Sequence, residues 1–327
     1  MTFIDFFAGI GGGRLGLELN GFQCIGYSEI DKAAVKTYEK LHSAENETNF
    51  GDITQIDPIL LPDFDLLIAG FPCQTFSIIG KREGLSNKKE GQLIYYIADI
   101  LKIKQPQYFI LENVKGLVHH DNGNTFKEIL QLLENVGYKV YFDVINSINF
   151  LPQSRERIYF VGIRDDIQIK YTPFELNNIL FNNMNNTVYN LKTFLNPTEE
   201  NLFDETSSSY KTFLRYLDNK YNKGKFSINE LLKQDYLIID TRQSDLRLYE
   251  NKIPTLRRNR QGILYVYKNR FYTLSAIEAL KLQGFGKIKN LEHKIIDLKK
   301  QDILKQCGNA MSVNVVENLA HNLMRIN

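Results

Sequence analysis

The chain has 327 residues, 43% of them hydrophobic, and a formal net charge of +2. This length accommodates one large domain or a domain with a smaller companion, and the composition is that of a globular protein. No apolar run approaches the roughly 20 residues that a membrane span needs, and the N-terminus starts as a strand rather than a signal peptide. We therefore expect a cytoplasmic protein without membrane contact.

Three widely spaced cysteines (Cys24, Cys73 and Cys307) match neither a disulfide framework nor a zinc site with its short ligand spacings. We expect no metal.

At the N-terminus, the apolar strand Phe3–Phe7 runs into the glycine-rich loop Ala8–Gly13, and a helix follows. Strand, glycine loop and helix form an opening typical of nucleotide-binding folds, because a ligand can approach the backbone and the free N–H groups of the helix start. Such a loop alone is weak evidence.

A second strand, Gln23–Ser28, ends in Glu29, and Asp31 caps the predicted helix Lys32–His42. An acid about twenty residues beyond the glycine loop, at the tip of the second strand, is placed to accept both ribose hydroxyls of a nucleotide. Asp52 is a further acid that could receive the exocyclic amino group of an adenine. An ordinary turn residue explains Asp52 equally well.

A single thiol follows the next apolar strand. Gly70 permits a sharp departure from the sheet and Pro72 fixes the backbone, so Cys73 is displayed at the sheet edge as a candidate nucleophile. Most lone cysteines are instead small buried hydrophobes. A second apolar strand, Tyr108–Val114, carries Glu112 near its end, which would bring a carboxyl and the thiol to neighbouring strand tips.

The pattern of alternating strands and helices continues to about residue 171. Thr125 and Glu128 form a capping box that predicts a helix ending at Gly137, and strands are predicted over Val140–Ile145 and Ile158–Ile163. The alternation predicts an α/β fold with one doubly wound, mostly parallel sheet.

Two arginines lie between the last two strands. Arg155 and Arg157 are separated by two positions, so on an extended segment they project from one face and reach the same site.

Beyond residue 171 the chain becomes polar and irregular, and Tyr236–Arg270 holds eight Lys and Arg against three acids. A phosphate backbone would select such a segment, although a solvated basic face is the commoner cause. Cys307 precedes a final apolar helix and is expected to be a packing residue.

Five motifs in order resemble those of the bacterial DNA (cytosine-5)-methyltransferases of restriction-modification systems. The resemblance covers most of the chain except about residues 171–240. The matching segments are Asp5–Gly12 for the cofactor loop, Phe71–Gln74 for the nucleophile, Glu112–Val114 for the catalytic acid, Gln153–Arg157 for the arginine motif and Gly308–Asn309 before the last helix. Lys88–Gly91 departs from the family's usual Asp-x-Arg-Gly, with the charges exchanged.

The resemblance implies a class I S-adenosylmethionine-dependent methyltransferase fold with a smaller, irregular target-recognition domain. It implies domains over residues 1–172 plus 304–327 (catalytic), 173–270 (target recognition) and 271–303 (connecting). It also assigns roles. The catalytic residues would be Cys73, Glu112, Arg155 and Arg157; the cofactor-binding residues Phe7, Gly9, Gly11, Glu29, Ile30, Asp52, Ile53, Pro72 and Asn309; the DNA-binding residues Gln74, Ser77, Arg242, Arg257, Arg258 and Arg260.

The implied reaction is methyl transfer from S-adenosylmethionine to C5 of a cytosine flipped out of duplex DNA, with S-adenosylhomocysteine as product. We expect a monomer that modifies DNA beside a restriction endonuclease encoded nearby, without direct contact to it. Two alternatives share the scaffold: a transfer-RNA cytosine-5 methyltransferase and an inactive DNA-binding relative. The catalytic groups argue against the inactive relative, and the long recognition module favours DNA over RNA.

Overall fold

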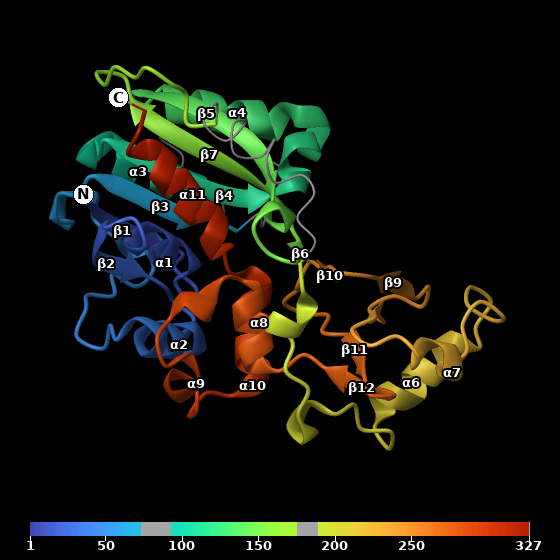
Figure 1. The fold of residues 1–327 in the computed structure, drawn as a ribbon. Helices are drawn as coiled ribbons and strands as arrows, with labels where there is room; N and C mark the ends of the chain where they lie inside the picture. The colour runs from blue at the N-terminus through green and yellow to red at the C-terminus, as the bar shows by residue number, and fades with distance from the viewer. Residues whose placement is uncertain (73–92, 175–188, 327) are drawn as a thin grey trace. The chain divides into compact units, whose positions relative to one another are not determined.

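The computed structural model describes residues 1–72, 93–174 and 189–326. Within these residues the chain divides into two compact units (Figure 1). The first unit holds residues 1–72, 93–146, 156–174 and 310–326, and the second holds 147–155 and 189–309. The functional boundaries predicted from the sequence at residues 172, 270 and 303 stay a prediction. Over the described ranges, the longest apolar helix is too short to cross a membrane.

A six-stranded sheet organises the first unit, in the order β2-β1-β3-β4-β7-β5. Strands β1, β2, β3 and β4 pair in parallel, whereas β7 runs antiparallel to both β4 and β5. The chain moves from β1 outward to β2 and then returns past β1 to β3, so the topological switch point lies between β1 and β3. The strands are β1 (Thr2–Phe6), β2 (Gln23–Ser28), β3 (Leu66–Gly70), β4 (Tyr108–Val114), β5 (Tyr138–Asn146) and β7 (Glu156–Arg164).

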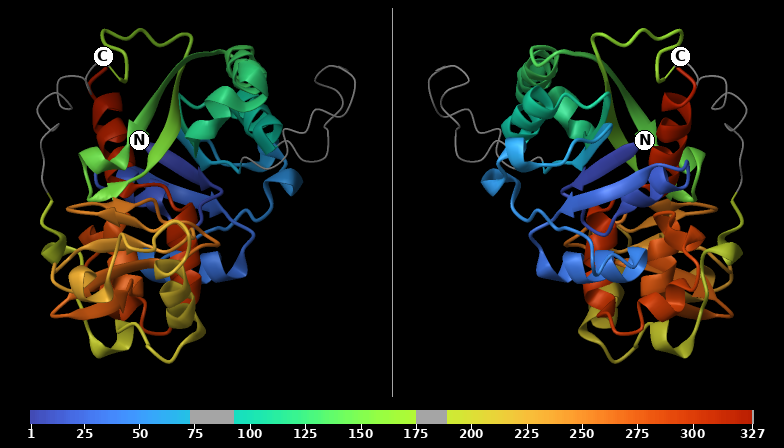
Figure 2. Two further views of the ribbon diagram at one scale, coloured as in Figure 1. Left: turned by 90° about the vertical axis from the view of Figure 1, so that its right-hand side faces the viewer. Right: turned by 90° about the vertical axis from the view of Figure 1, so that its left-hand side faces the viewer.

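Helices cover both faces of this sheet, with α3 and α4 on one side and α11 on the other (Figures 1 and 2). Alternate side chains of β3 pack on opposite faces of the sheet. Leu67 and Ala69 join the core cluster of α3 and α4, and Ile68 contacts α1. The helices of this unit are α1 (Gly12–Glu18), α2 (Lys32–His42), α3 (Leu93–Lys104), α4 (Asn124–Glu134) and α11 (Val313–Leu323), with 3-10 turns η1 (Ile53–Gln55), η2 (Pro58–Leu60) and η3 (Lys115–Gly123).

Glycines in α1 join the two ends of the chain. A Cβ on Gly12 would overlap the carbonyl of Met311, and one on Gly16 would overlap the side chain of Val316, so only glycine permits this close approach of α1 and α11. Asn20 Nδ2 adds a hydrogen bond of 2.8 Å to the carbonyl of Glu317. The C-terminal helix is therefore an integral part of the layer that holds the glycine loop.

Local capping signals were right at one helix and wrong at another. Asp31 caps α2 as predicted, since its side chain accepts from the N–H groups of Ala33 and Ala34. The capping box predicted at Thr125 and Glu128 does not form. Helix α4 begins one residue earlier, after a left-handed Gly123 with φ 84°, and the Thr125 hydroxyl instead pairs with His120 Nδ1 at 2.8 Å.

A four-stranded antiparallel sheet, β12-β11-β8-β9, forms the centre of the second unit. Its apolar face packs on α6 through Phe213, Leu264, Val266 and Phe271. The strands are β6 (Gln153–Ser154), β8 (Ile238–Asp240), β9 (Arg247–Tyr249), β10 (Ile253–Pro254), β11 (Ile263–Tyr267) and β12 (Arg270–Thr273), and β6 pairs in parallel with β10. The helices are α6 (Ser208–Leu217), α7 (Ile228–Leu231), α8 (Ala276–Leu282), α9 (Leu291–Lys294) and α10 (Lys300–Asn309), with turns η4 (Ser147–Asn149), η5 (Leu191–Thr193), η6 (Glu199–Asn201) and η7 (Phe285–Lys287).

A fully buried carboxylate ties the helices of this unit to its sheet. Glu278 on α8 accepts from the Tyr265 hydroxyl at 2.8 Å, from the backbone N–H of Asn196 at 2.6 Å and of Ser275 at 2.7 Å, and from Asn201 Nδ2 at 3.2 Å. A buried charge with four donors is well satisfied, and removing it would leave those donors unpaired. This network fixes α8 on β11.

Candidate active site

The glycine loop after β1 has an unusual backbone. Phe7, Gly9 and Gly11 all have positive φ, at 52°, 56° and 79°. The Ala8 N–H donates to the carbonyl of Ser28 at 3.1 Å, and the Gly11 N–H donates to the carbonyl of Ala8 at 2.8 Å, which holds the loop against the end of β2. Space beside Gly9 is open, because a Cβ built there meets only the Phe7 carbonyl at 4.0 Å. A ligand can therefore approach this backbone closely.

Glu29 is oriented by the loop at the end of β2. Its carboxylate accepts three backbone N–H bonds of 2.8 Å each, from Gly9, Ile30 and Asp31. The residue is partly exposed, and Oε2, which accepts one of the three bonds, has lone-pair capacity left for a ribose hydroxyl, whereas Oε1 already accepts two. Beside it, the Ile30 side chain is 69% exposed, which presents an apolar surface next to the carboxylate. An oriented acid beside open apolar surface suits a nucleoside.

Asp52 and Ile53 follow the same edge of the sheet. Asp52 is exposed and caps η1, accepting from the N–H and hydroxyl of Thr54 at 2.9 Å each, while Ile53 is buried in the core cluster. Gly51, at φ 72°, has no atom within 4 Å of a built Cβ, so the space beside it is also open. The assignment of Asp52 and Ile53 to a nucleotide cofactor therefore stays a prediction.

The end of α2 supports the glycine loop, a contact that the sequence did not reveal. His42 Nε2 lies 3.1 Å from the carbonyl of Ile10, and the His42 ring occupies the space where a Cβ on Gly11 would stand. The ring also packs at 4.8 Å from that of Tyr38. His42 thus sets the shape of the glycine loop, although the helix that carries His42 begins about twenty residues after that loop.

We expect Gly11→Ala to weaken S-adenosylmethionine binding by roughly 5- to 150-fold, because a left-handed backbone and an overlap with His42 together cost roughly 1–3 kcal/mol. Isothermal titration calorimetry measures the change. Gly21→Ala is a matched control, since Gly21 has the same φ of 79° but no neighbour within 4 Å. Equal binding by the two variants would show that His42 does not shape the loop.

The ends of β3 and β4 bring the acid beside the strand that leads to the thiol. Gly70 pairs with Glu112 in register, and Glu112 Oε2 lies 3.7 Å from a Cβ built on Gly70. Asn113 Nδ2 donates a hydrogen bond of 3.0 Å to the carbonyl of Phe71 and thereby fixes the residue that follows Gly70. Pro72 is exposed at this edge. Three predicted site residues, Cys73, Gln74 and Ser77, lie outside the described residues, as does Lys88–Gly91.

An arginine on the adjacent strand pairs with the acid. Arg157 Nε lies 3.0 Å from Glu112 Oε1, and both side chains are largely buried, with 15% and 8% of their surface exposed. Arg157 also donates 2.7 Å to the carbonyl of Glu156. A buried ion pair of this kind orients the carboxylate, because breaking it would leave a charge in the interior.

Arg155 belongs to the second unit, whereas Arg157 belongs to the first. Arg155 is buried, and its Nη1 lies 3.1 Å from the carbonyl of Gly308 and 3.4 Å from that of Leu256. It thereby joins the start of its own segment to α10 and to the β10–β11 loop. Asn309, the last residue of α10, is exposed in the same unit.

The arginines of the basic segment differ in their surroundings. Arg242 is 3% exposed and forms two bonds of 2.7 Å to the Asp240 carboxylate, so few of its N–H groups remain for a ligand. Arg257, Arg258 and Arg260 are exposed. Among the described residues, none of these three takes part in an ion pair. They are free to bind phosphate in a way that Arg242 is not.

Two cysteines are described, and neither is bonded to another cysteine. Burial raises the pKa of Cys24 to about 12, and burial likewise raises the pKa of Cys307, which is fully inaccessible on α10 and packs as predicted. Both are therefore thiols at neutral pH. No group of three or more His, Cys, Asp and Glu suited to a metal occurs in the part of the chain that the structure describes.

A mostly parallel sheet with a glycine loop at its switch point and an oriented acid at the end of the next strand is typical of α/β folds that bind a nucleotide-like ligand. The profile of the C-5 cytosine-specific DNA methylase family matches residues 1–325. The chain is 37% identical over 326 residues to the type II methyltransferase M.NgoBI of Neisseria gonorrhoeae, covering 96% of this chain and 90% of that protein. The chain therefore belongs to the C-5 cytosine-specific DNA methylase family.

Other similarities are more partial. The type II methyltransferase M.BsuFI of Bacillus subtilis is 50% identical over 179 residues, which is 54% of this chain and 43% of that protein. The crystal structure of the S. pombe Dnmt2 methyltransferase has a TM-score of 0.71 at 18% identity and covers 100% of this chain and 99% of that one. At such identity the likeness concerns the fold alone. These comparisons confirm the family, the fold class and the class of enzyme predicted from the motifs.

Proposed function

We propose that this chain transfers a methyl group from S-adenosylmethionine to C5 of a cytosine in a specific duplex DNA sequence, as the modification enzyme of a restriction-modification system. The observation that supports this most is the position of Glu112, beside the strand end that leads directly into Phe71–Gln74. The family match over residues 1–325 supports the assignment of Glu112 as the catalytic acid beside the nucleophile.

The first unit would bind the cofactor along the edge formed by the glycine loop. Phe7, Gly9 and Gly11 would border its methionine and adenosine, Glu29 would hold the ribose hydroxyls, and Asp52 would accept from the adenine amino group. Ile30 and Pro72 are exposed and would add apolar contacts, whereas the buried Ile53 and the exposed Asn309 are assigned to the site from their motifs alone. When bound, S-adenosylmethionine supplies the electrophilic methyl group.

The chemical step needs a nucleophile because C5 of cytosine is too electron-poor to accept a methyl group directly. Cys73, as a thiolate, would add to C6 and thus make C5 nucleophilic. Negative charge then develops towards N3, and Glu112, which must be protonated when the base is bound beside it, would donate that proton to N3. Arg157 would hold the Glu112 carboxyl in position. After methylation, a water molecule or another base would remove the C5 proton, the electron pair of that bond would form the C5–C6 double bond, and the Cys73 thiolate would leave. N3 would return its proton to Glu112, which restores the neutral aromatic ring.

The second unit would recognise DNA. Arg257, Arg258 and Arg260 are exposed cations without ion-pair partners among the described residues, which is the property that phosphate contacts require. Gln74, Ser77 and Arg242 are assigned to DNA from their motifs and position in the sequence, and Arg155 to the target base and its phosphate. Flipping the cytosine out of the duplex costs about a few kcal/mol, which contacts of this kind offset.

Methyl transfer to duplex DNA and to transfer RNA tests the proposal directly. With tritiated S-adenosylmethionine, we expect incorporation into DNA, and bisulfite sequencing of DNA from cells expressing the protein would identify the modified cytosine. Preferential labelling of transfer RNA would replace the proposal with the RNA alternative. Cofactor binding without labelling of either substrate would favour the inactive DNA-binding relative.

Arg258→Ala should weaken DNA binding most at low salt. Each lost phosphate contact reduces the slope of log affinity against log salt by about one, so the affinity of the variant falls less steeply as salt rises. Fluorescence anisotropy at several salt concentrations measures this slope. Arg164→Gln is the control, because Arg164 is already paired with Asp166 at 2.7 Å, and its slope should match the wild type. A defect that grows with salt would contradict a phosphate contact.

A further inference from the structure

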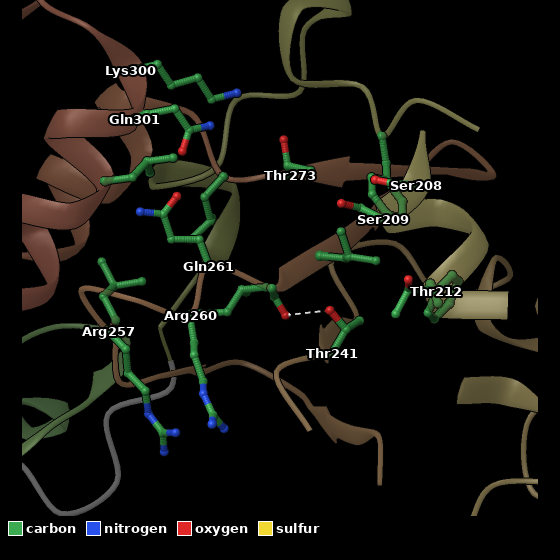
Figure 3. Close-up of a pocket in the computed structure, with 18 of the residues that line it drawn as sticks. Ser208, Ser209, Thr212, Thr241, Arg257, Arg260, Gln261, Thr273, Lys300 and Gln301 are labelled. Atoms are coloured by element: carbon green, nitrogen blue, oxygen red, sulfur yellow. Dashed lines mark hydrogen bonds between the residues drawn. The ribbon is translucent and has the colours of Figure 1, made fainter. Parts of the chain in front are cut away.

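A cavity of about 420 Å³ lies within the second unit, bordered by α6, the β10–β11 loop and α10 (Figure 3). Its volume is in the range of about 300–1,000 Å³ that small-molecule sites occupy. The residues assigned above to cofactor and catalysis do not line it. Of the predicted DNA-binding residues, Arg257 and Arg260 line this cavity and Arg258 does not.

The cavity carries unbalanced positive charge. Arg257, Arg260 and Lys300 line it, and none of its described lining residues is acidic. Figure 3 shows the side chains of Arg257 and Arg260 extending side by side from the loop, away from Lys300 of α10 and from Ser208 and Ser209 of α6, so the two arginines form one end of the cavity. The nearby Asp240 carboxylate does not line the cavity, and Arg242 pairs with both its oxygens at 2.7 Å, so the Asp240–Arg242 pair leaves the net charge of the lining positive. Such a rim selects a phosphate-bearing ligand.

The first turn of α6 adds to this field. Ser207 caps the helix by accepting from the Tyr210 N–H, and the next two residues, Ser208 and Ser209, line the cavity with exposed hydroxyls. The N–H groups of a first helical turn have no partner within the helix, and the helix dipole places positive charge there. This helix end and the three cations lie on walls from separate elements, so two independent features favour an anion.

The interior differs from a simple phosphate groove. Apolar side chains form much of the lining, among them Phe213, Tyr216 and Leu256. Gln261 and Gln301 are exposed residues of the lining and add neutral donors and acceptors at its opening, and neither amide forms a hydrogen bond within the described residues. A phosphate on a passing DNA backbone needs only the cationic rim. An apolar interior with free amides suits the flat, polar-edged ring of a nucleobase.

We propose that this cavity binds one mononucleotide unit, with the phosphate on Arg257 and Arg260 and the base inside, between the apolar wall and the two glutamine amides. The source is either an extrahelical nucleotide of the DNA or a free nucleotide. Binding of an extrahelical nucleotide rests on the proposed function. In that case the cavity would hold an unpaired nucleotide of the same DNA duplex whose target cytosine enters the active site.

Binding of 2′-deoxynucleoside 5′-monophosphates to the full chain tests the proposal, with inorganic phosphate and unphosphorylated nucleosides as comparison probes. By isothermal titration calorimetry, we expect at least one monophosphate to bind more tightly than phosphate and than its own nucleoside. Arg260→Gln should weaken this binding about tenfold, as loss of a charge-assisted bond does. Ser209→Trp fills the cavity without changing the charge and should abolish binding.

Arg258→Gln is the matched control, because Arg258 is adjacent and exposed but does not line the cavity, and it should keep the monophosphate affinity. A DNA duplex with one bulged nucleotide distinguishes the sources. Displacement of the bound monophosphate by that duplex, but not by a fully paired one, assigns the cavity to DNA, whereas simultaneous binding of both assigns it to free nucleotide.

Equal binding of phosphate and nucleotide would overturn the base-binding part, and binding that Ser209→Trp leaves intact would overturn the site itself. Both readouts are independent of methyl transfer. An enzyme that methylates DNA but binds no monophosphate disproves the cavity alone, and one that binds monophosphate without methylating disproves the activity alone.

Discussion

We expect Cys73→Ser to abolish methyl transfer while leaving S-adenosylmethionine binding within a few-fold of the wild type. A serine hydroxyl stays neutral at the pH where a thiolate forms, so it does not add to C6. Tritiated methyl transfer measures the loss, and calorimetry measures cofactor binding. The structure supplies an argument by elimination, since the chain has three cysteines and the pKa values of the other two are raised, with Cys24 partly buried and Cys307 fully buried.

Cys24→Ala is the control for this prediction and should retain methyl transfer. DNA with 5-fluorocytosine at the target gives a second readout, because fluorine cannot leave as a cation and the covalent adduct persists. The adduct should survive denaturing electrophoresis in the wild type and in Cys24→Ala, and should be absent in Cys73→Ser. Loss of cofactor binding in Cys73→Ser would instead make the cysteine a structural residue.

Elements with strong local signals were predicted with their observed boundaries. Strand β2 and helix α2 match the predicted ranges Gln23–Ser28 and Lys32–His42, because apolar patterning and the Asp31 cap act over a few residues. The failed cap at Thr125 shows the limit of this reasoning. There a histidine on the preceding turn takes the threonine hydroxyl, and the sequence pattern does not reveal that competition.

Features that depend on long-range packing were not predictable. The alternation of strands and helices predicted a mostly parallel sheet, but not that β7 runs antiparallel between β4 and β5. His42 was read only as the end of a helix, although it shapes the glycine loop. Arg242 and Arg258 are equivalent in a sequence, and only burial against Asp240 distinguishes them. Asp240, two positions before Arg242, was the only sequence feature that could have indicated the pairing of Arg242.

The same reasoning explains why motif residues were easier to find than their supports. Glu112 stands out because an acid ends an apolar strand, whereas Asn113 is recognised in the sequence only as a member of the Glu112–Val114 motif, with no role of its own. In the fold, Asn113 holds the Phe71 carbonyl at 3.0 Å and so fixes the backbone just before the nucleophile loop. Such supporting contacts cross strands that lie far apart in the chain, so their partners appear only when the register is known.

Glu112→Gln should slow the chemical step by roughly 10²-fold or more, in keeping with general-acid contributions to catalysis. The amide keeps the shape of the side chain and still accepts a bond from Arg157, so the ends of β3 and β4 should stay in place. It has no acidic proton to give to N3, and the charge that develops when Cys73 adds to C6 is then poorly stabilised. Single-turnover methyl transfer isolates this step from product release.

Glu156→Gln is the matched control for this change. Glu156 lies on β7, one residue before Arg157, and its exposed carboxylate pairs with Lys115 at 2.9 Å. Exposed pairs contribute about 0–1 kcal/mol, so this variant should retain the wild-type rate and melting temperature. Glu112→Gln should likewise bind S-adenosylmethionine normally and form the 5-fluorocytosine adduct more slowly. A single-turnover rate equal to that of the wild type would remove Glu112 from the mechanism and leave its pair with Arg157 as a structural contact.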